Sequence, residues 1–360
     1  MQHRKLHLLP HLLIINMCKL LFIGDLNEGT RSLMRAKKLE KMVKTVVKVS
    51  NTKVPYIAGI DKPSLIYRIF HKLGIPLDIE NLNSKVVKLV GSNVFDIIWV
   101  EKSIMLKPST LKSIRLKNPL AKIISVSEDD MFASHNRSVY YDKSLPIYDI
   151  VFTTKVYNLI ELKTLGAQST ELFLDSFDED LHRPLSKYSD IKTKKHDVCF
   201  VGTFEAERAE TMIWLSSKGV KVTIFGNGWS GLKNKYTNLI IKDKPVYGEE
   251  YVRVINNSKI NLGFLRKINR DEVTSRTMEI NACESFLIAE RTSRHNELFI
   301  EGKEVEFFST NEELYEKIQH YLTHDNLISG ISKRGRKRCL QSGYDMTNQL
   351  SIILSKTTSN

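Results

Sequence analysis

The chain has 360 residues, 42% hydrophobic and 26% charged, which is enough to build the cores of two ordinary domains and excludes general disorder. No apolar stretch reaches the roughly 20 residues of a membrane span, and the four cysteines lack metal-ligand or redox spacing, as expected of reduced thiols in a cytoplasmic protein. The net charge is +13, and residues 1–150 hold 24 Lys and Arg against 13 Asp and Glu. Nucleic acid, anionic lipid and phosphorylated substrates are therefore candidate partners. The simpler alternative is a solvated lysine-rich surface.

The N-terminal stretch contains an apolar run that Pro10 interrupts and that lacks a small-residue cleavage site, so a signal peptide is not expected. Met17 opens the pattern "MCKLLFIGDLNEGT", which predicts a strand entering a glycine turn. We therefore interpret residues 1–16 as an extension from an upstream start codon.

Short β-branched and aromatic runs then alternate with helix-like segments along the chain. Apolar runs without alternation indicate strands buried on both faces, and helices between them are typical of parallel sheets built from βαβ units. Residues 35–48 and 106–117 are predicted helices with outward lysines, and residues 311–322 form an amphipathic helix. The predicted strands are 18–24, 95–100, 121–126, 148–154, 196–202, 221–226, 259–265, 285–290 and 304–308.

The strand–glycine–helix pattern starts twice, with "KLLFIGDLNEGT" and again with "DVCFVGTFEAER". The polar segment 177–195 lies between the two sets and is predicted to be a linker. We expect an α/β fold of two Rossmann-like domains, residues 17–185 and 186–360, facing each other across a cleft. Ligands of such sheets bind beyond the carboxyl ends of the strands.

The segment "SRTMEINACESFLIAERTSRHNELF" (275–299) combines groups suited to a nucleotide. A helix capped by Thr274 or Ser275 carries Glu279, whose carboxylate can accept two hydrogen bonds from a ribose diol. After the strand, Thr292 or Ser293 can cap a second helix, whose free N–H groups can hold phosphate, with Arg291 and Arg294 beside them. The alternative is an ordinary crossover with surface acids.

The same segment resembles the C-terminal signature of group 1, GT-B-fold glycosyltransferases. "EINAC" supplies Glu279, Ala282 and Cys283, and Glu297 lies 18 residues after Glu279. "DVCFVGTFEAER", "VTIFGNGW" and "SRTMEINAC" are most similar to the CgeB-like (spore-maturation, YkvP-type) branch. The resemblance is strong over 196–345 and weaker but collinear over 17–185. The sequence departs from the family at Glu284, where a glycine is usual, and in the glycine-free loop 291–295.

The resemblance implies a hexosyltransferase-type enzyme that moves a sugar from a nucleoside-diphosphate sugar to a glycan, a lipid-linked molecule or a protein. We expect no metal and no cofactor besides the donor, because a helix N-terminus and arginines can stabilise the leaving diphosphate. The cysteines favour a cytoplasmic location, the basic half makes the inner membrane face a candidate site of action, and no specific nucleic acid is expected. Glu279 matches the ribose-contacting acid of the family's Glu-x7-Glu pair, and Asp271 matches the first, catalytic acid. Donor sugar, base, acceptor and stereochemistry are left open.

Further residues are candidates on chemical grounds. Asp129 or Asp130, after the strand 121–126, is the candidate base of an inverting enzyme, with a helix-capping acid pair as the alternative. Asp25 and Glu28 are acceptor candidates. Each nucleotide candidate has a structural alternative, such as a packed turn or a solvated arginine. The nucleotide-binding candidates are Gly202, Arg208, Asn227, Arg266, Arg276, Glu279, Ser293 and Glu297.

Three other motifs are given less weight. "DED" (178–180) resembles a metal-binding motif but lies in the predicted linker, where His182 is also interpreted as a linker residue. The basic run 332–338 is interpreted as the solvated face of a helix. The competing class is a non-catalytic double-Rossmann protein that binds nucleic acid or a membrane through its basic half, and dependence of nucleotide binding on Glu279 distinguishes the two.

Overall fold

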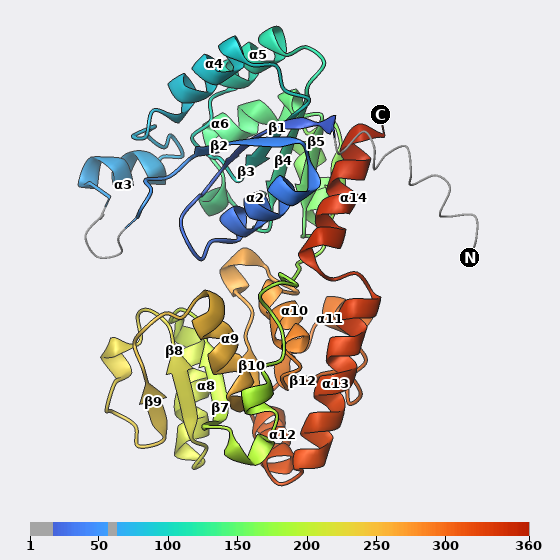
Figure 1. Ribbon diagram of the computed structural model, residues 1–360. Coiled ribbons are helices and arrows are strands. Elements are labelled where there is room, and N and C mark those ends of the chain that lie inside the picture. The colour runs from blue at the N-terminus through green and yellow to red at the C-terminus, as the bar shows by residue number, and fades with distance from the viewer. Residues whose placement is uncertain (1–16, 57–62, 360) are drawn as a thin grey trace, which may run out of the picture. The chain divides into compact units, whose positions relative to one another are not determined.

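The computed structural model describes residues 17–56 and 63–359 (Figure 1). The chain divides into two compact units, the first made of residues 1–174 with 347–360 and the second of residues 175–346. The expectation for residues 1–16 lies outside the described residues. In the part of the chain that the structure describes, no helix is long and apolar enough to cross a membrane.

The first unit is built on a six-stranded sheet in which every strand is parallel to its neighbours, in the order β2-β1-β3-β4-β5-β6. Its central strands are buried, as their unbroken apolar sequences predict. The strands are β1 (Lys19–Gly24), β2 (Thr45–Ser50), β3 (Ile97–Glu101), β4 (Lys122–Ser127), β5 (Ile150–Thr153) and β6 (Thr170–Leu172). The helices and 3-10 turns are α2 (Arg31–Met42), α3 (Leu65–Lys72), α4 (Leu82–Ser92), α5 (Pro108–Lys117), η1 (Ser134–Asn136), α6 (Val139–Ser144), η2 (Leu145–Ile147) and α7 (Asn158–Thr164).

The predicted helix over residues 35–48 is wrong in its second half. Helix α2 ends at Met42, Val43 is already extended, and Val47 pairs in parallel with Leu21 as part of β2. The run "TVVKV" (45–49) is rich in β-branched residues, whose restricted side chains favour a strand, and this outweighs the helical spacing of the lysines around it.

The second unit has another all-parallel six-stranded sheet, ordered β12-β11-β10-β7-β8-β9. The order reverses between β7 and β10, and ligands of doubly wound folds bind beside this reversal, beyond the carboxyl ends of the strands. The strands are β7 (His196–Val201), β8 (Val222–Phe225), β9 (Leu239–Ile241), β10 (Ser258–Gly263), β11 (Leu287–Glu290) and β12 (Glu306–Phe308). The helices and turns are η3 (Ser186–Tyr188), η4 (Ile191–Thr193), α8 (Ala206–Ser217), η5 (Ser230–Leu232), α9 (Gly248–Asn256), η6 (Lys267–Asn269), α10 (Ser275–Ala282), α11 (Ser293–Leu298), α12 (Asn311–Leu322) and α13 (Asp325–Gln341).

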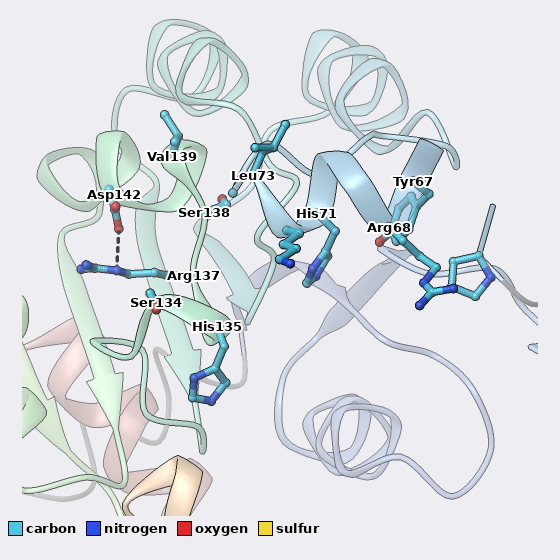
Figure 2. A pocket seen from close by; sticks show the side chains of 13 residues that line it. Tyr67, Arg68, His71, Leu73, Ser134, His135, Arg137, Ser138, Val139 and Asp142 are labelled. Carbon is cyan, nitrogen blue, oxygen red and sulfur yellow. Dashed lines mark ion pairs between the residues drawn. The ribbon is translucent and has the colours of Figure 1, made fainter. Parts of the chain in front are cut away.

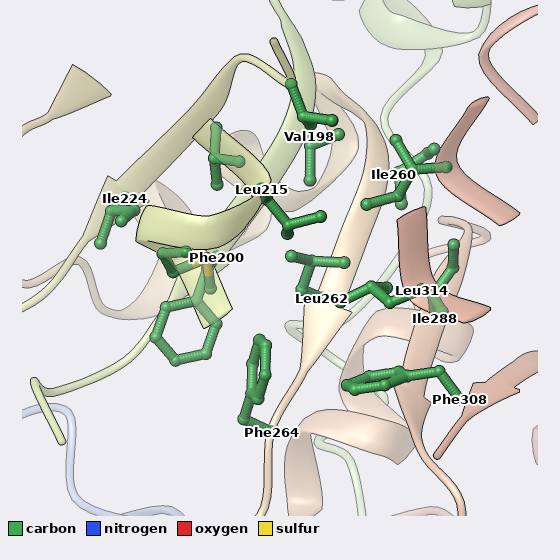
Figure 3. Packing of buried hydrophobic residues seen from close by; sticks show 14 of the residues in the cluster. Val198, Phe200, Leu215, Ile224, Ile260, Leu262, Phe264, Ile288, Phe308 and Leu314 are labelled. Atoms are coloured by element: carbon green, nitrogen blue, oxygen red, sulfur yellow. The ribbon is translucent and has the colours of Figure 1, made fainter. Parts of the chain in front are cut away.

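The core of the second unit lies between this sheet and its helices (Figure 3). Phe264 contacts Phe200 and Phe308 edge-on, with ring centroids 5.4 and 5.6 Å apart, a geometry that aromatic pairs prefer. Helix α12 inserts Leu314 and Ile318 into the same core, as its amphipathic sequence predicts. The residues that form the carboxyl ends of β7 and β10 are therefore held on a rigid layer.

The last helix, α14 (Met346–Thr358), belongs from residue 347 onward to the first unit. Lys356 lies 2.5 Å from Glu171, Gln349 accepts a hydrogen bond from the backbone of Leu174, and Leu350 and Ile353 are buried. The division therefore falls between residues 174 and 175, whereas the sequence predicted 185 and 186 and assigned the C-terminus to the second domain. No local sequence motif predicts that α14 buries its apolar side chains in the first unit, because the contacts are distant in the sequence.

Candidate functional site

Two loops at the carboxyl ends of β7 and β8 are joined backbone to backbone. The Gly202 amide donates to Phe225 O, and the Phe204 amide donates to Asn227 O, at 2.8 and 2.9 Å. The Trp229 indole donates to Gly202 O at 2.8 Å. A Cβ on Gly226, where φ is +149°, would lie 1.9 Å from Gly202 O, so only glycine permits this approach. The "FGNGW" stretch thus fixes the Gly202 loop, and Asn227 contributes its backbone while its side chain is exposed.

Arg208 lies in the first turns of α8, directly behind the Gly202 loop, and is only 5% exposed. Its Nη1 donates to Thr203 O at 3.3 Å, and its Nη2 lies 3.4 Å from a Glu205 oxygen. The buried Nε and Nη2 have no hydrogen-bond partner among the described residues. A buried cation with unused donors is costly to a folded protein, so this guanidinium is a candidate ligand for an anion.

Arg266 and Arg276 complete an arginine cluster with Arg208. Burial lowers the pKa of Arg208, Glu205 opposes this, and the positive charges of Arg276 and Arg266 lower it further. Arg266 follows β10, its side chain is half-exposed, and its Nε donates to Glu205 at 3.0 Å. Arg276 lies in the first turn of α10. The cluster therefore lies at the two strands that flank the reversal of the sheet.

Glu279 is 9% exposed on α10, and His182 Nε2 lies 3.9 Å from its carboxylate. His182 Nδ1 accepts a hydrogen bond from the Asp178 amide at 2.9 Å, so the ring proton sits on Nε2, on the side of Glu279. Tyr251 is buried edge-on to His182, and burial followed by the charge of Glu279 raises the pKa of its hydroxyl well above the usual value. His182, interpreted from the sequence as a linker residue, is 2% exposed and lies inside the second unit beside Glu279, so it is not a solvated linker residue.

A buried histidine, His295 on α11, joins helix α10 to α11 through hydrogen bonds. His295 Nδ1 donates to Glu290 O at 2.8 Å, so its Nε2 accepts from the Thr277 hydroxyl at 2.9 Å. Burial lowers the pKa of His295 to about 4, which keeps the ring neutral near pH 7. Since Thr277 lies two residues before Glu279, this chain of hydrogen bonds helps to fix the position of the carboxylate.

Residues 208–355, most of the second unit and the last helix, match a family described as "Glycosyl transferase-like". No curated protein has a significantly similar sequence. Solved structures share the fold. Sucrose-phosphate synthase (tll1590) from Thermosynechococcus elongatus is 13% identical with a TM-score of 0.66, covering 94% of this chain and 98% of that chain. The chain therefore shares the two-domain GT-B fold of these structures, and its residues 208–355 are similar to the glycosyl transferase-like family.

Two further structures with this fold are nucleotide complexes. The α-glucosyltransferase (AGT) in complex with UDP is 13% identical with a TM-score of 0.69, covering 95% of this chain and all of that chain. Anabaena Alr3699/HepE in complex with UDP and glucose is 12% identical with a TM-score of 0.61, covering 94% of this chain and all of that chain. The predicted architecture of two Rossmann-like domains is thereby confirmed, whereas the CgeB-like branch is not distinguished.

The GT-B chain differs from the prediction in the loop after β11. Arg291, a predicted phosphate ligand, lies 2.6 Å from both Glu301 and Glu313, and these acids occupy its guanidinium. Arg294 pairs with Glu297 one turn later on α11. Thr292 caps that helix, and Ser293 is exposed at its start. The two arginines therefore stabilise the fold locally. Nucleotide binding by Ser293 and Glu297 stays a prediction.

Asp271 and Glu284 have clear backbone roles. Asp271 accepts hydrogen bonds from Asn269 Nδ2 at 2.6 Å and from the Arg266 amide at 3.4 Å, which shapes the turn that carries Arg266. Glu284 adopts a φ of +53°, a conformation that glycine reaches at less cost. The glycine that the family resemblance implies at this position would therefore have a conformational reason, and Glu284 adopts the positive φ in its place.

The predicted base candidates differ sharply in accessibility. Asp130 is fully buried, and its Oδ1 accepts hydrogen bonds from the Phe132 amide and from Asn158 Nδ2 at 3.1 and 2.9 Å. This carboxylate holds a turn and does not reach the surface, which argues against Asp130 as a base. Asp129 is one-third exposed and lies 2.5 Å from Lys102 Nζ, so the accessible candidate is an acid that is already paired with a cation.

A buried ion network in the first unit was not predicted from the sequence. Arg35 contacts Glu101 at 2.6 Å and Glu128 at 2.7 Å, and Arg31 contacts Glu128 at 2.9 Å. Burial disfavours the ionised Glu128, but Arg31 and Arg35 outweigh burial and lower its pKa to about 2. The partners are 66 to 97 residues apart, so the only local signal is a glutamate ending an apolar strand.

The remaining motifs also find local partners. Asp25 accepts hydrogen bonds from Asn27 and Thr52 and orders its own loop, while Glu28 forms an exposed pair with Lys37. In the basic run on α13, Arg334 and Arg336 donate to backbone carbonyls and Arg338 pairs with Glu304. Among the described residues, no group of three or more His, Cys, Asp and Glu side chains could hold a metal ion.

Proposed function

We propose that this GT-B protein transfers a hexose from a nucleoside-diphosphate sugar to an acceptor, and that the arginine cluster (Arg208, Arg266 and Arg276) holds the diphosphate. Arg208 carries the proposal, because two of its nitrogens are buried without a partner at the position where this fold binds ligands. A planar guanidinium matches phosphate oxygens with two parallel hydrogen bonds. The UDP complexes of the α-glucosyltransferase and HepE support UDP as the first nucleotide to test.

Glu279 is proposed to accept hydrogen bonds from the ribose diol. Its carboxylate lies on the same helix as Arg276, one turn later, so diphosphate and ribose can be contacted from one element. His182 adds a ring N–H on the side of this carboxylate. It is proposed as a positioning residue that keeps Glu279 oriented.

The arginine cluster is also proposed to stabilise the leaving diphosphate without a divalent cation. Three guanidinium groups and the N-terminal end of α10 supply the positive charge that a metal supplies in other enzymes. Turnover should then survive a chelator such as EDTA. Loss of activity on chelation, restored by Mg²⁺ or Mn²⁺, would contradict this part of the proposal.

Asp271 and Asp129 are retained as proposed catalytic residues with different tasks. Asp271 belongs to the turn that carries Arg266, which suits a contact with the donor sugar. Asp129 would act as base only in an inverting enzyme, and its ion pair with Lys102 holds it in place. Replacing Asp129 by Asn separates the two stereochemical cases, since a retaining enzyme should keep most of its activity.

The acceptor is proposed to be a glycan, a lipid-linked molecule or a protein, handled by a CgeB-like enzyme that works in the cytoplasm or at the inner membrane face. Helix α3 supports contact with an anionic membrane. None of its residues is buried, and Leu65, Ile66, Ile69 and Phe70 are 38–70% exposed. Apolar side chains that face water, in a unit rich in lysine, suit the boundary of anionic lipid.

The decisive experiment measures thermal unfolding with a panel of nucleoside diphosphates. A ligand that binds only the native state raises its melting temperature, so UDP or another member should stabilise the wild type and fail to stabilise Arg208→Gln. Arg253→Gln, at an exposed arginine of α9, is the matched control and should respond like the wild type. The nucleotide that binds selects the sugar donors for a turnover assay. Equal stabilisation of Arg208→Gln would exclude the cluster as the diphosphate site.

A further inference from the structure

The first unit contains an open cavity of about 820 Å³ that the proposed chemistry does not yet use (Figure 2). Helix α3 forms one wall with Tyr67, Arg68, His71 and Lys72. The opposite wall is formed by residues 134–139, which run from η1 into α6, and by Asp142. In Figure 2, His71 on α3 and His135 on the opposite side lie on either side of the same space.

The lining of this cavity is strongly basic. Arg68, Lys72 and Arg137 are permanent cations, His71 and His135 can become cations, and Asp142 is the one acid among the described lining residues. Asp142 lies 3.7 Å from Arg137, and burial raises the pKa of its carboxyl while Arg137 opposes that rise. Nη1 of Arg137 is buried without a hydrogen-bond partner among the described residues. The cavity therefore has an excess of positive charge among its described lining residues.

Helix α3 is oriented in a way that packing alone does not explain. An amphipathic helix normally turns its apolar side toward the protein core. Here the side with Tyr67, Arg68 and His71 lines the cavity, while Leu65 and Ile66 are 70% and 62% exposed. The inward side is the one that a polar, anionic ligand would need.

We propose that this cavity binds an acceptor that bears a phosphate group, with Arg68, Lys72 and Arg137 as the phosphate ligands. The proposal rests on the proposed function, because it names the substrate class of the same transfer reaction. A phosphate alone would leave most of an 820 Å³ cavity empty, so the acceptor is of the size of a sugar or polyol phosphate. The rings of Tyr67 and His71, 6.0 Å apart, offer aromatic faces against which a sugar can pack.

The test uses glucose 6-phosphate as the probe and glucose as its uncharged counterpart. Calorimetric titrations are run in saturating UDP, so that the arginine cluster is already filled. The wild type should bind glucose 6-phosphate and show little affinity for glucose. Arg68→Gln/Lys72→Gln should lose about tenfold or more in affinity, since charge-assisted hydrogen bonds are removed. Lys85→Gln/Lys88→Gln, with the same charge change at exposed positions of α4, should bind like the wild type.

Arg137→Gln provides an independent variant on the opposite wall, should the double variant unfold α3. Equal affinity for glucose and glucose 6-phosphate, unchanged affinity in both cavity variants, or no binding at millimolar probe would overturn the proposal. Binding that appears only without UDP would also overturn it, because the probe would then occupy the nucleotide site. UDP affinity should be unchanged in Arg68→Gln/Lys72→Gln, so failure of the nucleotide site and failure of the cavity give different results.

A second arm identifies the source of the phosphate group. Vesicles of phosphatidylcholine with phosphatidic acid present the same phosphate monoester on a lipid, and pure phosphatidylcholine is the reference. Sedimentation that requires phosphatidic acid, is lost in Arg137→Gln and is competed by glucose 6-phosphate indicates a lipid-linked acceptor. Binding of the free sugar phosphate without vesicle binding indicates a soluble acceptor. Vesicle binding that Arg137→Gln and glucose 6-phosphate leave unchanged would contradict a phosphate site in the cavity.

Discussion

Two buried arginines, one in each unit, differ in whether the fold supplies their anions: Arg35 contacts two carboxylates, and Arg208 keeps unused donors among the described residues. Arg35 and Arg208 are both 5% exposed, and both lie near the carboxyl ends of parallel strands. Arg35 contacts the carboxylates of Glu101 and Glu128 at 2.6 to 2.7 Å, and these acids raise its pKa. Arg208 faces Glu205 at 3.4 Å and two further arginines, and its pKa is lowered.

The difference shows that burial and charge alone do not identify a binding residue. What separates the two arginines is whether the fold already supplies their anions. The ion network of Arg35 is complete within the first unit, so its role is stability. Arg208 has unused donors among the described residues, which agrees with the proposal that an external anion completes its hydrogen bonding.

The largest expected effect is on stability, at Arg35. Arg35→Gln leaves Glu101 buried beside Trp99, whose indole donates to it at 2.8 Å, without its cation. Removing one partner of a buried pair typically costs about 3–5 kcal/mol. Urea unfolding should show this loss, and Arg31→Gln, at the more exposed end of the network, should cost less. A loss below about 1 kcal/mol for Arg35→Gln would show that the network is not structural.

The pH dependence of the free energy of unfolding tests the same network at Glu128. Its pKa in the folded protein is about 2, below the value of 4.5 for a free glutamate, so its ionised form stabilises the fold above about pH 4.5, and this stabilisation is lost as pH falls toward 2. The shift corresponds to about 3 kcal/mol at neutral pH. Glu128→Gln should be less stable than the wild type by about this amount at pH 7, and the difference should shrink as pH falls from 4.5 to 2. A difference that does not depend on pH would point to packing instead of charge.

The sequence was sufficient for the fold because the relevant signals are local. Unbroken apolar runs such as "IIWV" and "VCFV" predict central parallel strands, and a glycine ends β1 and directly follows β7. Strand β2 was missed because Lys48 continues the helical spacing of the lysines before it, and β6 and β9 because three residues carry too little signal. The return of α14 to the first unit depends on contacts about 180 residues apart, which a linear pattern does not show.

The predicted site residues also differ in whether their partners are close or distant in the sequence. Arg208, Arg276 and Glu279 lie on helices that follow directly from recognisable strand and cap patterns, and the structure places them at the expected end of the sheet. Arg291 had the same local signal, yet its partners Glu301 and Glu313 come from later elements. His182 had no local signal at all, because only the folded chain brings it to Glu279. Sequence patterns name candidate cations and acids, and only the fold shows which of them are already paired.

The third prediction concerns nucleotide affinity at Glu279. Glu279→Ala should weaken UDP binding by about 1.5–3 kcal/mol, roughly ten- to hundredfold, because charge-assisted hydrogen bonds to the ribose are lost. His182→Gln should cause a smaller loss, since this residue acts only through Glu279. Glu316→Ala, at an exposed acid of α12, is the matched control, and Glu297→Ala tests the other predicted acid on α11. Unchanged UDP affinity in a folded Glu279→Ala protein would remove the ribose assignment, and an equal loss in Glu297→Ala would move it to α11.

The smallest expected effect is the change in the free energy of unfolding at Arg208, and it tests the comparison with Arg35. Without nucleotide, Arg208→Met should change the free energy of unfolding by less than about 1 kcal/mol, or even raise it, because a poorly paired buried cation is replaced by an apolar side chain of similar length. The same variant should lose stabilisation by UDP, so its stability and its affinity should respond in different ways. Arg35→Met provides the contrast, since it removes a well-paired cation and should destabilise the protein strongly. If Arg208→Met lost as much stability as Arg35→Met, Arg208 would be a structural residue, and its unpartnered nitrogens would no longer indicate a diphosphate site.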